Sequence, residues 1–101
     1  MNTASLISDA KARFSHNSAK AYLKDKYHSK LIVAEQGGLW SVTPELLGFL
    51  ASSTSETVVL IDNFENPVKV NRASLYDVLV NTYHTTMEQW YDEWKELESK
   101  R

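Results

Sequence analysis

Residues 73–101 constrain the fold of this chain more than any other stretch. They contain no glycine and no proline, so nothing in them interrupts a helix. Large apolar side chains recur there mostly every three or four residues, the repeat of one helix face: Leu75, Tyr76, Leu79, Tyr83, Met87, Trp90, Trp94 and Leu97. Such a helix spans about 44 Å, whereas a compact chain of about 100 residues has a radius of gyration of about 13 Å. The sequence therefore predicts a C-terminal helix whose far end reaches past its own domain and needs a partner.

The composition is that of one small globular domain. The chain has 101 residues, of which 43% are hydrophobic and 24% are charged. It has no cysteine, which excludes disulfides, thiolate catalysis and cysteine-based zinc sites. The longest apolar run, Val58 to Ile61, is far too short for a membrane span, and residues 1–9 lack the basic and apolar regions of a signal peptide. We therefore expect a cytoplasmic protein without a membrane contact.

The first half of the chain predicts helix, hairpin and helix. Residues 1–30 form a basic helical region, and the polar residues 15–18 leave open whether it is one helix or two. Residues 31–42 are two short apolar runs around a glycine turn, as in a hairpin. Thr43 and Pro44 are typical of a helix start, and a short helix follows.

The second half predicts another hairpin before the long helix. Residues 57–61 are apolar on both faces, which favours a central strand. Residues 68–71 alternate like a half-exposed strand, whose open edge is an alternative site for a partner strand, and Asn71 or Ser74 can cap the final helix. We expect a single α+β domain in which 31–72 is hairpin–helix–hairpin. Its small antiparallel sheet of three or four strands packs against an N-terminal helical region, a short middle helix and the long C-terminal helix.

The aromatic end of the C-terminal helix is the main candidate site. One interpretation is that its side chains belong to the core of their own domain. The other is an intermolecular contact, because Trp, Tyr and Met are enriched in interface cores. The residues expected to make that contact are Tyr83, Met87, Trp90, Tyr91, Trp94 and Leu97. We expect a non-enzymatic interaction or assembly module that binds a protein partner or itself, with a homodimer as the favoured form.

Charge is distributed unevenly, and this suggests an alternative function. Residues 1–30 have six basic and two acidic side chains, 6 − 2 = +4, whereas residues 73–101 have three basic and six acidic ones, 3 − 6 = −3. The basic residues of the N-terminal region could bind nucleic-acid phosphates: Lys11, Arg13, Lys20, Lys24, Lys26 and Lys30. The net charge of −2 argues against a dedicated nucleic-acid binder, so this role is the second hypothesis.

No catalytic, metal or cofactor site is expected. His16, His28 and His84 lack the spacing that zinc-binding helices need. Glu35 and Asp62 are the only carboxylates beside strand ends, and both are typical of turns.

Three stretches resemble a family of phage proteins: Ala4 to Phe14 (ASLISDAKARF), Gln36 to Trp40 (QGGLW) and Asn66 to Arg72 (NPVKVNR). With them the chain is similar, over most of its length, to small conserved proteins of unknown function in T4-like tailed bacteriophages, including those that infect cyanobacteria. The resemblance carries no catalytic residues. It implies synthesis in the cytoplasm of an infected bacterium, as a small binder of phage or host proteins or a minor assembly factor.

Overall fold

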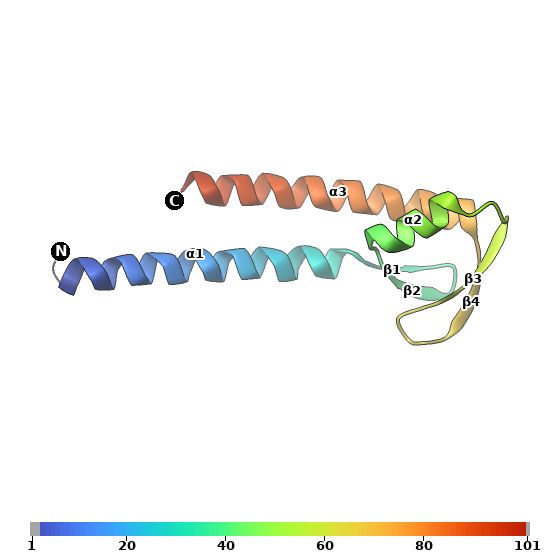
Figure 1. The fold of residues 1–101 in the computed structure, drawn as a ribbon, viewed down its shortest axis with the longest axis horizontal. Helices are drawn as coiled ribbons and strands as arrows, with labels where there is room; N and C mark the ends of the chain where they lie inside the picture. The colour runs from blue at the N-terminus through green and yellow to red at the C-terminus, as the bar shows by residue number, and fades with distance from the viewer. Residues whose placement is uncertain (1–2, 101) are drawn as a thin grey trace.

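The computed structural model describes residues 3–100 and shows a small head from which two long helices project side by side (Figure 1). These arms are helix α1 (Thr3–Lys30) and helix α3 (Arg72–Ser99), which run antiparallel. The molecule measures 66 × 25 × 18 Å and has a radius of gyration of 19.3 Å. The molecule is therefore more extended than a compact chain of this length, because α1 leaves the head alongside α3 instead of folding over the sheet.

The head contains both predicted hairpins. Strands β1 (Ile32–Glu35) and β2 (Gly38–Ser41) pair antiparallel, as do β3 (Thr57–Ile61) and β4 (Pro67–Asn71). The four strands form two separate two-stranded sheets, so the expected single sheet of three or four strands is wrong, although the α+β class is confirmed.

Isolated hydrogen bonds from side chains and backbone join the two sheets, which share no strand pairing. The Gln36 side-chain amide donates to the carbonyl of Asn71 at 3.2 Å and accepts from its N–H at 2.8 Å. The Asn63 N–H donates to the carbonyl of Leu39 at 2.8 Å. Because each sheet has only two strands, β3 is not central, and its Val59 and Ile61 side chains are exposed instead of buried as expected.

The first hairpin turns inside the predicted glycine turn. Gln36 and Gly37 occupy the turn with φ angles of 50° and 80°, which suit the tight turns that join antiparallel strands. Gly38 begins β2, and a Cβ atom there would come within 2.5 Å of the Trp40 ring. The second glycine therefore makes room for the buried indole, whose Nε1–H donates to the Glu35 carbonyl at 2.9 Å.

The predicted starts of the middle helix and of the C-terminal helix are both confirmed. Helix α2 (Pro44–Ser52) is capped by the Thr43 hydroxyl, which accepts from the Leu46 N–H at 3.2 Å. Helix α3 is capped by the Asn71 side chain, which accepts from the Ser74 N–H at 2.9 Å.

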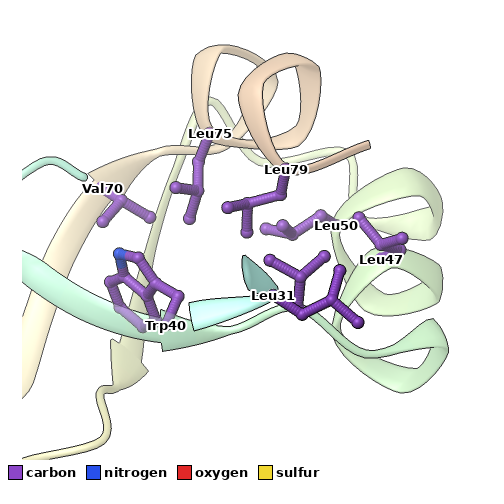
Figure 2. Packing of buried hydrophobic residues seen from close by; sticks show 8 residues of the cluster. Leu31, Trp40, Leu47, Leu50, Val70, Leu75 and Leu79 are labelled. Atoms are coloured by element: carbon purple, nitrogen blue, oxygen red, sulfur yellow. The ribbon is translucent and has the colours of Figure 1, made fainter. Parts of the chain in front are cut away.

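The hydrophobic core lies in the head, between the two hairpins, α2 and the first two turns of α3 (Figure 2). Its buried members are Leu31, Trp40, Val42, Leu47, Leu50, Val70, Leu75 and Leu79. The arms therefore project from a packed core. Outside the head, the described residues of each arm pack against the other arm.

Candidate protein interface

The strip of α1 that faces α3 is narrow. Leu23 and Tyr27 of α1 are buried, and helical spacing places Ala19, His16 and Ala12 on the same side. The N-terminal end of α1 extends further from the head than the end of α3 does (Figure 1). This strip of α1 covers one side of the aromatic helix opposite and leaves its flank open.

Trp90 is held by a cluster of α1 side chains. Its ring stacks on that of Tyr27, with centroids 6.0 Å apart and planes 10° apart, and meets the edge of the His28 ring at 5.5 Å. Next to it, Glu93 accepts hydrogen bonds from Lys26 Nζ at 2.7 Å and from the Tyr27 hydroxyl at 2.5 Å. The hydrogen bond from Lys26, followed by that from Tyr27, lowers the pKa of Glu93 below its ordinary value. This cluster fastens the arms to each other just outside the head.

We predict that closure of the arms depends on the charge of Glu93. A carboxyl whose pKa is lower in the folded state stabilises the fold above its unfolded value of about 4.3, and that stabilisation is lost as pH falls through the folded pKa. Wild-type tryptophan fluorescence, to which Trp90 contributes beside Trp40 and Trp94, should therefore change as pH falls through the folded pKa of Glu93. Glu93→Gln should show the changed emission already at neutral pH and lose the part of the acid transition that comes from the arms. Glu96→Gln is the control, because the pair it makes with Lys100 lies on the exposed side of one helix. An acid-induced change of the same size in Glu93→Gln and in the wild type would contradict the assignment.

The six residues expected at an interface fall into three pairs. Tyr83 and Met87 are half-buried against the head core. Trp90 and Leu97 are half-buried on the side that faces α1. Tyr91 and Trp94 remain exposed, at 54% and 39% of their surface. The inference from helix length alone missed that α1 would shelter part of this end within the same chain.

The exposed pair and two half-buried neighbours form one surface, which we call the aromatic patch: Met87, Trp90, Tyr91 and Trp94. They line an apolar hollow of about 300 Å³ on the flank of α3. The Tyr91 and Trp94 rings lie 6.1 Å apart and tilted by 33°, so they present a joined surface. Exposed Glu88 and Asp92 border it.

The apolar repeat of α3 is not confined to its distal end but begins near the start of the helix. Alternating steps of four and three residues connect Tyr76, Val80, Tyr83, Met87, Trp90, Trp94 and Leu97. That spacing is the heptad repeat by which helices pack on other helices. Extending the repeat back to Tyr76 would have predicted from the sequence that α3 packs on other elements along most of its length.

The six basic residues of the N-terminal region do not form one surface. Lys26 binds Glu93, and Lys30 lies over the Tyr27 ring, 5.1 Å from its centroid. Arg13, Lys20 and Lys24 are exposed, and their spacing of seven and four residues aligns them along one side of α1. We call these three the basic row. Lys11 is exposed off that row.

His16 and Asp62, two of the other titratable residues considered in the sequence, have structural partners. His16 Nε2 lies 3.3 Å from a Glu98 carboxylate oxygen, across the arms. Asp62 is buried at the junction of the hairpins and accepts from the N–H groups of Asn66, Phe64 and Leu39 at 3.0–3.1 Å. The bond from Asn66 makes the largest contribution to lowering the pKa of Asp62, against the effect of burial. Within residues 3–100, no three His, Asp or Glu side chains are grouped to hold a metal ion.

Comparisons with known proteins place no further constraint on this surface. No protein-family model, curated protein or solved structure matches the chain. Among the helices of residues 3–100, none is both long and apolar enough to cross a membrane.

Proposed function

We propose that this protein is a non-enzymatic interaction module that binds another protein surface through the aromatic patch. The observation that carries the proposal is that Tyr91 and Trp94 stay exposed next to each other after α1 has covered the rest of the helix end. Exposed aromatic clusters with a polar border are typical of protein contacts. The resemblance to phage proteins extends the proposal to a binder or assembly factor in an infected bacterial cytoplasm.

The patch is large enough in energetic terms. Burying a large apolar side chain contributes roughly 1.5–3 kcal/mol. Micromolar binding corresponds to about 8 kcal/mol, so a few such anchors supply the gross gain from which the cost of association is subtracted. Tyr91 and Trp94 are suited to this role, because their side chains have few rotatable bonds and so lose little conformational entropy on burial.

A photo-cross-linking residue in place of Trp94 should form covalent adducts with a protein in the cells that make this chain. The same residue in place of Phe49 is the matched control, because Phe49 is an exposed aromatic of α2 in the head. Adducts should be identified by mass spectrometry, which also separates self-adducts from adducts to another protein. Equal labelling from both positions, or none from position 94, would contradict a binding role for the patch.

A further inference from the structure

We propose that the occupant of the aromatic patch is a second copy of this chain, docked about a two-fold axis parallel to the arms. The aromatic patch of each copy then packs on the basic row of the other. This inference rests on the proposed function and adds the partner and its orientation.

The aromatic patch and the basic row share one face of the arm pair. The opposite face carries a groove lined by Tyr22, Glu96 and Lys100, among others. On a helix, successive residues are about 100° apart. Tyr22 and Lys24 therefore flank the buried Leu23 on opposite sides.

The same reasoning orients the far end of α3. Glu96 and Glu98 flank the half-buried Leu97, and Glu96 lines the opposite groove. Trp94 and Tyr91 precede Glu98 by four and seven residues, so they lie on its side of the helix. Each copy consequently presents one face on which an aromatic strip of α3 runs beside a basic strip of α1.

The two strips are also level along the arms. Trp90 lies beside Tyr27 and His28, and Glu93 binds Lys26. Four residues further along the antiparallel helix, Trp94 is level with the stretch between Lys20 and Lys24. A two-fold axis parallel to the arms preserves these levels while it places α3 of one copy on α1 of the other.

Charge favours this arrangement over its main competitor. The patch is bordered by Glu88 and Asp92, which are exposed and make no ion pair within residues 3–100. Packing patch on patch would bring these acidic borders together, whereas packing patch on basic row neutralises them. Lysine stems can cover the aromatic rings while their ammonium groups remain near the carboxylates or over the ring faces.

The resulting assembly is a four-helix bundle with both heads at the same end. In it each α3 has an α1 on either side, and every neighbouring pair is antiparallel and opposite in charge. This is the arrangement of an up-down-up-down bundle.

The absence of cysteine from the chain permits a direct test by disulfide trapping. Lys24→Cys and Tyr91→Cys are prepared as separate single variants, mixed in equal amounts, reoxidised and examined by mass spectrometry. The mixed disulfide should dominate, because a disulfide forms only when the two Cα atoms approach to roughly 4.4–6.8 Å. Tyr22→Cys mixed with Tyr91→Cys is the control and should give little product, since Tyr22 lies on the opposite face.

The other outcomes separate this inference from the proposed function. A dominant Tyr91→Cys homodisulfide would mean that patches meet patches, which overturns the orientation. Light scattering that shows wild-type protein monomeric at high concentration would overturn the second copy, while position-94 adducts to a different protein would leave the interaction role standing. If no adduct forms at position 94 in cells, the proposed function fails as well.

Discussion

Leu79→Ala should lower the free energy of unfolding by about 2–5 kcal/mol, the usual loss for a large side chain in a closed core. Leu79 is 0% exposed, and it packs in the cluster where α3 meets α2 and both hairpins (Figure 2). Its removal would leave a cavity where α3 meets the other elements of the head. Urea unfolding followed by circular dichroism at 222 nm measures the difference.

Val78→Ala is the matched control for this prediction. It is the preceding residue of the same helix, its side chain is 37% exposed, and alanine favours helix more than valine does. We expect a change below about 1 kcal/mol there. A similar loss from both variants would mean that the stability of the chain does not depend on the head core.

The predictable parts of this fold were those fixed by local chemistry. Thr43 and Pro44 start α2, and Asn71 caps α3, because a capping side chain reaches backbone groups only two or three residues away. The hairpin turns were found for the same reason, since turns depend on a few adjacent residues. The continuity of α1 through residues 15–18 was left open, since propensity alone does not decide whether polar residues break a helix.

The packing of the elements on one another depends on residues far apart in the sequence, and it was not predicted correctly. The arms are joined by contacts such as that of Lys26 with Glu93. These residues are 67 positions apart in the sequence, so no local pattern predicts that they meet. The two hairpins were expected to share a sheet, yet they meet through the Gln36 amide and the Asp62 carboxylate. The aromatic end of α3 was recognised as a candidate interface, with the core of its own domain as the other interpretation. That the strip of Ala12, Ala19 and Leu23 on α1 would cover part of it was not foreseen, because no local pattern connects these two stretches.

That division of the aromatic end determines which substitutions test self-association. Trp90→Ala would also loosen the arms, because Trp90 stacks on Tyr27. Tyr91→Ala combined with Trp94→Ala removes only exposed rings. The double variant should keep the wild-type circular dichroism and unfolding midpoint at low concentration. Its self-association should be at least about a hundredfold weaker than that of the wild type, as expected when two central aromatic anchors are truncated.

Sedimentation equilibrium over a wide concentration range measures that loss, with Phe14→Ala as the control. Phe14 is an aromatic residue of α1 and is 74% exposed. It lies nine residues, or two and a half helical turns, from Leu23 and so faces away from α3. Because a large exposed aromatic is lost in either case, a general effect of surface hydrophobicity would weaken both variants alike. Only a specific contact at the aromatic patch would weaken the double variant and spare Phe14→Ala. Unchanged association of the double variant would therefore remove Tyr91 and Trp94 from the interface and require the two copies to meet elsewhere.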